Sequence, residues 1–69
     1  MSTSTYRVEG MSCSHCVQAV TREVSALSGV AAAVVDLNAG TVAVTGEVTE
    51  AEVASAVADA GYTLAGRVL

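Results

Sequence analysis

The hydrophobic residues of this chain follow two periods, one of three to four residues and one of two. Between residues 13 and 28 they recur every three or four positions, and four of them define the repeat: Val17, Val20, Val24 and Leu27. This spacing places them on one face of an amphipathic helix. Gly29 follows closely and suits the left-handed position just past a helix end. We therefore predict a helix over about residues 13–28.

Four other segments are rich in β-branched or apolar residues and predict β-strands. They cover residues 5–8, 30–37, 41–45 and 62–68. In the third segment Val42 and Val44 alternate with small or polar residues, as in a strand that buries one face. The turn at residues 38–40 joins the second and third strands into a hairpin, and Gly66 predicts a bulge in the last strand.

A second helix is predicted by its capping residues. Thr49 is followed three residues later by Glu52, which is the pattern of a capping box, and Gly61 suits the position after the helix end. Three residues line the predicted buried face: Val53, Val57 and Ala60. The order of elements is then βαββαβ, an α+β ferredoxin-like sandwich in which two helices cover one face of a four-stranded antiparallel sheet.

Length and composition define a single small domain. We expect residues 1–4 to form a polar N-terminal tail and residues 5–69 to form the domain. The chain is 52% hydrophobic, but much of this is alanine, and Tyr6 and Tyr62 are its aromatic residues. Small side chains contribute little apolar area, so we expect modest stability without a ligand.

The charge excludes two classes of partner. The net charge is −4, with three arginines and no lysine, so a basic surface for nucleic acid or for an anionic membrane is absent. No apolar stretch approaches the ~20 residues of a membrane-spanning helix, and we expect no membrane insertion. The first residues carry neither a basic nor an apolar leader region, so we expect a cytoplasmic protein with reduced cysteines.

The segment Gly10-Met11-Ser12-Cys13-Ser14-His15-Cys16 carries the chemistry. Both cysteines lie where the first strand gives way to the first helix, and residues three apart at a helix start project to the same side. The unpaired N–H groups and positive dipole end of the helix favour thiolates and should lower the pKa of both cysteines. Gly10 gives the backbone the freedom to turn. We predict that Cys13 and Cys16 bind one soft metal ion.

The number of ligands narrows the choice of metal. Thiolates favour Cu(I), zinc or iron–sulfur clusters. Structural zinc sites usually have four ligands and clusters typically need four cysteines, whereas this chain has two cysteines and one histidine. Two sulfurs satisfy the near-linear coordination of Cu(I), which is the predicted ion, although a dimer that pools its ligands would still hold zinc.

A dithiol oxidoreductase is the main rival from another class, because Cys-x-x-Cys near a βαβ pattern is also a redox motif. The chain is too short for a thioredoxin-like fold, has no proline, and lacks an aromatic residue before Cys13. We therefore expect no enzyme activity.

The motif Gly10-Met11-x-Cys13-x-x-Cys16 after a strand, with Ala60-Gly61-Tyr62 before the last strand, resembles the heavy-metal-associated domain family over residues 5–68. The chain is similar in particular to small bacterial copper chaperones. The resemblance implies a Cu(I) carrier that delivers its ion, by ligand exchange, to the metal-binding domain of a copper-exporting P-type ATPase. It also implies that Met11 packs inward under the loop and that Tyr62 lies beside the metal.

The interpretations of the remaining residues of the segment are less specific. His15 is either an exposed residue without a role, a group that lowers the pKa of the thiols, or an extra ligand in a copper-bridged homodimer. Ser12 and Ser14 are loop and cap residues that supply hydrogen-bond donors. Three functional alternatives stay open: an excised metal-binding domain of a P-type ATPase, a carrier of zinc or Hg(II), and a chaperone that also serves a copper-responsive regulator.

Overall fold

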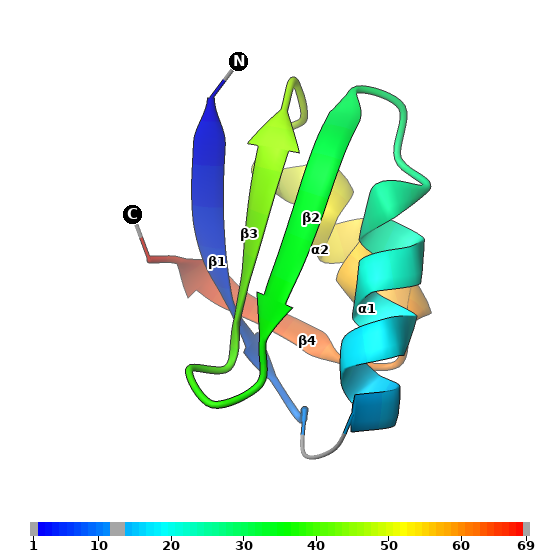
Figure 1. Cartoon of the computed structure of the whole chain (residues 1–69), viewed down its shortest axis with the longest axis vertical. Helices are drawn as coiled ribbons and strands as arrows, with labels where there is room; N and C mark the ends of the chain where they lie inside the picture. Colours follow the sequence, from blue (N-terminus) through cyan, green and yellow to red (C-terminus); the bar gives the residue numbers. More distant parts are fainter. Residues whose placement is uncertain (1, 12–13, 69) are drawn as a thin grey trace.

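The computed structural model describes residues 2–11 and 14–68, which form the predicted βαββαβ order. The elements are β1 (Thr3–Glu9), α1 (Ser14–Ser25), β2 (Val30–Asp36), β3 (Thr41–Gly46), α2 (Glu50–Asp59) and β4 (Thr63–Arg67). The strands form one antiparallel sheet in the order β2-β3-β1-β4. Both helices lie on the same side of this sheet (Figure 1). The predicted ferredoxin-like sandwich is therefore confirmed.

The core between sheet and helices consists mainly of valine. Its six fully buried side chains are Val20, Val24, Val42, Val44, Val53 and Val57. All six were predicted from the two hydrophobic periods. Leu27 and Ala60, which we expected on the buried faces of the helices, are half-buried and pack against this core. Ala56 is buried as well, at 3% exposure, although the helical pattern did not single it out.

Two boundaries differ from the sequence prediction by more than one residue. β1 begins at Thr3, so that Thr3 and Ser4, expected in the N-terminal tail, pair with Thr45 and Val44 of β3. The hydroxyl oxygens of Thr3 and Thr45 lie 2.9 Å apart and form a hydrogen bond. A polar threonine pair extends the strand here, because cross-strand hydroxyl contacts stabilise a sheet without burying apolar area.

The end of α1 is the second difference. The helix ends at Ser25, three residues before the predicted end, and Leu27 donates its N–H to the Val24 carbonyl in a tighter turn (3.1 Å). Gly29 follows with φ +96°, and a Cβ there would lie 2.6 Å from the Glu47 carbonyl oxygen. The chain therefore needs glycine at this position to pass from α1 into β2.

The predicted caps of α2 and the predicted bulge are confirmed, whereas Gly29 lies four residues after the end of α1 and is not its C-terminal cap. Glu52 N–H donates to Thr49 Oγ1 (3.2 Å), and Thr49 N–H donates to Glu52 Oε1 (2.9 Å), which together make the capping box of α2. In β4 the register shifts, because Arg7 pairs with Gly66 while the next residue, Val8, pairs with Leu64. One extra residue in β4 makes the bulge.

Candidate metal site

The candidate metal site lies at the end of the molecule where β1 leads into α1 (Figure 1). Gly10 makes the turn with φ +96°, as the sequence predicted. The β2–β3 turn reaches the same end, because Val8 N–H donates to the Gly40 carbonyl at 2.8 Å. The backbone just before Gly10 is therefore fixed by a hydrogen bond to the β2–β3 turn.

Cys16 occupies the first turn of α1 and is 6% exposed. The first N–H groups of a helix have no partner within the helix, and they stabilise a negative charge placed beside them. A thiolate at this position gains from that field. The predictions for Ser12, Cys13 and the Ser14 side chain lie outside the described residues.

Met11 and Tyr62 bring apolar surface to the site. Both side chains are half-buried and pack against the core. A Cβ built on Gly10 would lie 3.2 Å from Cδ1 of Tyr62, so the tyrosine ring lies directly against the loop backbone. The ring thus contacts Gly10. Residue patterns in the sequence did not predict this contact, because the two residues are far apart in the chain.

The turn after α2 explains why Tyr62 reaches the loop. Gly61 has φ +96° and donates its N–H to the Ala58 carbonyl (2.9 Å), while Tyr62 N–H donates to the Val57 carbonyl (3.1 Å). These two bonds form the Schellman motif that ends many helices. The motif fixes the direction in which the chain leaves α2, and therefore the position of the tyrosine ring.

His15, the second residue of α1, is exposed to solvent. Its exposure is compatible with each of the three readings given above. Within residues 2–11 and 14–68, no group of three or more histidine, cysteine or carboxylate side chains is arranged to hold a metal ion.

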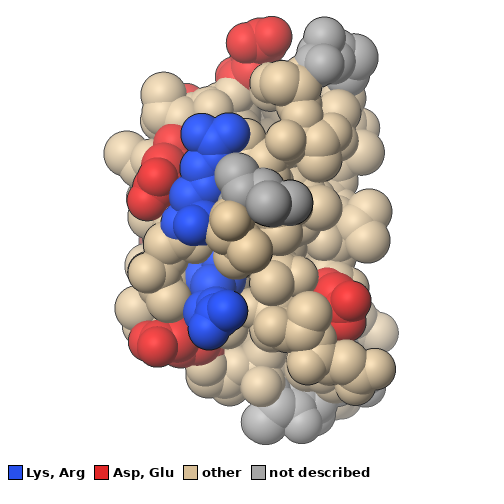
Figure 2. All heavy atoms as spheres, turned by 90° about the vertical axis from the view of Figure 1, so that its left-hand side faces the viewer, with Lys and Arg blue, Asp and Glu red and all other residues tan. Residues whose placement is uncertain are grey.

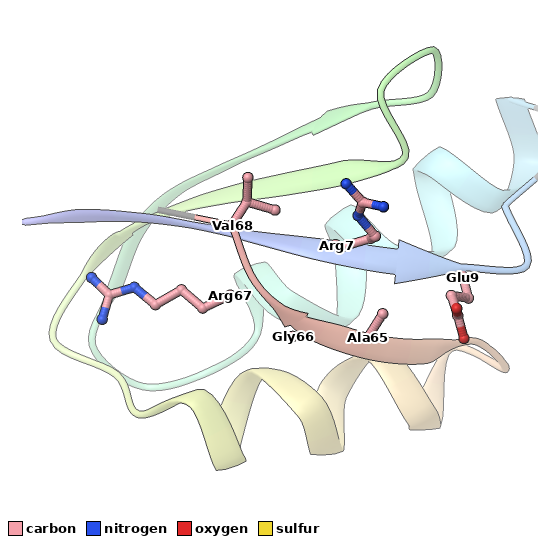
Figure 3. A pocket seen from close by; sticks show the side chains of 6 residues that line it. All are labelled: Arg7, Glu9, Ala65, Gly66, Arg67 and Val68. Carbon is pink, nitrogen blue, oxygen red and sulfur yellow. The ribbon is translucent and has the colours of Figure 1, made fainter.

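A shallow depression of about 520 Å³ lies on the side of the sheet away from the helices (Figure 3). Its lining residues come from β1 and from β4 with the residue that follows it: Arg7, Glu9, Ala65, Gly66, Arg67 and Val68. None of the described residues from 10 to 16 lines it. Figure 2, which faces the left-hand side of Figure 1, shows arginine side chains gathered in one stripe with carboxylates at its margins. The depression is therefore separate from the candidate metal site.

No helix in the part of the chain that the structure describes is long and apolar enough to span a membrane.

Comparison with known proteins agrees with the fold and the motif. The chain is 46% identical over 68 residues to the copper chaperone CopZ of Bacillus subtilis (strain 168), covering 94% of this chain and 99% of that protein. The solved structure of a CopZ metallochaperone superposes with a TM-score of 0.86 at 36% identity, covering 91% of this chain and 98% of the other.

A domain of a transport protein has the same fold. The N-terminal domain of a potential copper-translocating P-type ATPase from Bacillus subtilis, in its Cu(I)-loaded state, superposes with a TM-score of 0.81 at 27% identity. The match covers 94% of this chain and 88% of that one. The heavy-metal-associated domain family matches residues 5–63, which is most of the chain. The chain therefore belongs to the heavy-metal-associated domain family.

Proposed function

We propose that this chain is a copper chaperone that binds one Cu(I) ion through the thiolates of Cys13 and Cys16. The observation that carries the proposal is the position of Cys16, buried in the first turn of α1 and three residues after Cys13, the other cysteine of the chain. A helix start favours two thiolates and also the negative charge that they retain around a monovalent ion. Two soft ligands match the coordination that Cu(I) prefers.

The neighbouring residues would shape the site without binding the ion. Met11 and Tyr62 pack against the core beside the loop, and Tyr62 lies against Gly10. Their apolar surface would keep water away from one side of the sulfurs, while the exposed His15 leaves the other side open to a partner. An ion held between a closed side and an open side is protected and still accessible to an incoming ligand.

Transfer would proceed by exchange of thiolates. A thiolate of the recipient adds to the bound Cu(I), one chaperone thiolate then leaves and takes up a proton, and a second exchange completes the transfer. The ion changes no oxidation state in this sequence, so no oxidant or reductant is needed. Each step replaces one Cu–S bond with another, and the direction depends on the difference in affinity between the two sites.

The proposed recipient is the metal-binding domain of a copper-exporting P-type ATPase. Support comes from the shared fold, because the N-terminal domain of a potential copper-translocating P-type ATPase from Bacillus subtilis superposes on this chain. A free-standing chaperone is favoured over an excised ATPase domain, since identity is 46% to the CopZ chaperone and 27% to the ATPase domain. We place the carrier in the cytoplasm, where its thiols would stay reduced.

The test of metal choice is an anaerobic titration with Cu(I) and with Zn(II) against calibrated chelators. The wild type should bind one Cu(I) per chain, and Cys13→Ser/Cys16→Ser should lose this binding. Ser25→Ala, at the opposite end of α1, is the matched control and should bind like the wild type. Tight Zn(II) binding with weak Cu(I) binding would overturn the proposal, as would Cu(I) binding that survives in the double variant.

The test of delivery uses the Cu(I)-loaded chain and an ATPase metal-binding domain, separated after mixing. Copper should distribute between the two within minutes, while a chelator of equal affinity, held behind a dialysis membrane, should gain copper much more slowly. Equal rates for domain and chelator would mean that copper dissociates first, and would exclude direct ligand exchange.

A further inference from the structure

The face of the sheet away from the helices, here called the open face, is formed by the strand residues that alternate with the buried ones. Most of its positions carry threonine or alanine, such as Thr41, Ala43 and Thr45 along β3. Because these side chains are short, another surface can approach the strands closely, while the shallow depression lined by residues of β1 and β4 leaves room for side chains of that surface. Two exposed valines and three charged residues interrupt this pattern: Asp36 and Arg7 lie in one row, and Glu9 lies two residues further along β1 at the end of the face.

The two valines lie in one row across the sheet. Val34 of β2 pairs with Ala43, and Ala43 pairs with Thr5 of β1. The Thr5 carbonyl then accepts a hydrogen bond from Val68 N–H at 2.7 Å. Val34 is 65% exposed and Val68 is 44% exposed, and these are the large hydrophobic side chains that the described residues leave exposed. They stand at opposite ends of the row.

The charges lie in a neighbouring row. Asp36 pairs with Thr41, and Thr41 pairs with Arg7. Both charged residues are exposed, and Arg7 points away from the helices, as Val68 does (Figure 3). The open face therefore has a negative charge on β2 and a positive charge on β1, two strands away in the same row.

We propose that the open face is a homodimer interface, on which a second copy packs with its own open face. The two copies are related by a two-fold axis that runs parallel to the strands, between β3 and β1. This rotation places β2 of one copy against β4 of the other, and β3 against β1. Each row of residues then faces the same row of the other copy. Val34 then faces the partner's Val68, and Val68 faces the partner's Val34.

The same rotation brings opposite charges together. Arg7 comes to lie over the partner's Thr41, one strand away from the partner's Asp36. Packed sheets are about 10 Å apart and neighbouring strands about 4.8 Å apart, which an extended arginine side chain spans. Each Arg7 side chain then extends toward Asp36 of the other copy, and away from Arg7 of the other copy. A self-complementary surface of this kind is what an isologous dimer requires.

The size of the surface is that of a weak, transient interface. Four strands at ~4.8 Å spacing and about five residues at ~3.4 Å give on the order of 300–400 Å² of flat face per copy. The two faces together stay below the ~1,200 Å² of standard stable interfaces, so we expect a dissociation constant on the order of 0.1–1 mM. The candidate metal site lies at the end of the sheet and stays exposed, so this dimer differs from a copper-bridged one.

The test is sedimentation equilibrium of the apo chain with reductant and chelator, which exclude disulfides and bridging metal. From about 10 μM to about 1 mM, the mean mass should rise from 6.9 kDa toward twice that value. Val34→Asp and Arg7→Glu should weaken association at least tenfold. Ser55→Asp, which places the same new charge on the exposed side of α2, is the matched control and should associate like the wild type.

Specificity is tested by exchanging the charges. Arg7→Asp/Asp36→Arg should associate like the wild type, although Arg7→Asp alone does not. Because Asp36 Oδ1 also accepts a hydrogen bond from Ala39 N–H (3.1 Å), the fold of the exchanged variant is checked by its NMR spectrum. If that variant does not fold, the comparison of Val34→Asp with Ser55→Asp decides. A wild type that stays monomeric at 1 mM, or equal losses in Val34→Asp and Ser55→Asp, would overturn the proposal.

Discussion

Replacing Gly10 by alanine separates two costs at the candidate metal site, one of the backbone and one of the Tyr62 ring. Gly10 has φ +96°, where an L-residue costs about 1–2 kcal/mol. The added Cβ would also lie 3.2 Å from Tyr62 Cδ1, so the ring has to move by a few tenths of an ångström. Moving a packed ring from its preferred rotamer adds about 0.5–1.5 kcal/mol.

Gly61 provides the matched control, because it has the same φ of +96° and a Cβ there would meet nothing within 4 Å. Gly61→Ala should therefore cost the backbone term alone. Gly10→Ala should destabilise the apo chain by about 0.5–1.5 kcal/mol more, which lowers its melting temperature by a further ~2–12 °C in a domain of this size. Urea and thermal unfolding of both variants measure the difference.

The Tyr62→Leu background completes the comparison. There the extra cost of Gly10→Ala over Gly61→Ala should shrink, because the flat ring that the new Cβ would meet is gone. If Gly10→Ala costs no more than Gly61→Ala in the wild-type background, the ring does not rest on the loop, and the account of the site given above is wrong.

Three further predictions concern the cap, the core and the metal. Thr49→Ala removes the capping box of α2 and should lower the free energy of unfolding by about 1 kcal/mol in urea titrations, and an unchanged midpoint would contradict this. Val20→Ala, in the core, should cost about 2 kcal/mol, while the exposed Val34→Ala should cost less than about 0.5 kcal/mol; equal losses would mean that Val20 is not packed as described. Cu(I) affinity should fall as pH falls, by up to about 100-fold per unit once both thiols are protonated, because binding then displaces two protons. An affinity that stays constant from pH 8 down to a pH at which alkylation shows both thiols of the apo chain to be protonated would exclude a two-thiolate site.

Periodicity predicted most of the fold from local information. The spacing of Val20 and Val24 defined α1, the alternation of Val42 and Val44 defined β3, and both pairs are buried. These signals are strong because a half-buried element has to repeat its apolar residues with its own geometric period. Ala56 was missed for the opposite reason, since alanine is common on both sides of a helix and gives little contrast.

The features that sequence patterns did not predict depend on contacts between distant segments. Thr3 extends β1 because a hydroxyl partner, Thr45, stands opposite on β3, and a polar residue at a chain end carries no such information by itself. The approach of Tyr62 to Gly10 depends on the Schellman turn at Gly61 and on the pairing of β1 with β4. The resemblance to a family predicted that Tyr62 lies beside the site. The local pattern predicted only that Tyr62 begins the last strand, and not that it contacts Gly10.

The largest fully buried side chains among the described residues are all valines, and this limits where the molecule can change shape. A β-branched side chain has one strongly preferred rotamer in a helix and few elsewhere, so it loses little rotational entropy on folding and cannot adapt afterwards. Among the described residues, the long, flexible side chains of Met11, Leu27 and Leu64 pack only at the margin of this core, so its centre cannot absorb a shift of one element by repacking. Neither helix is therefore expected to shift against the sheet when the proposed Cu(I) ion is bound or released.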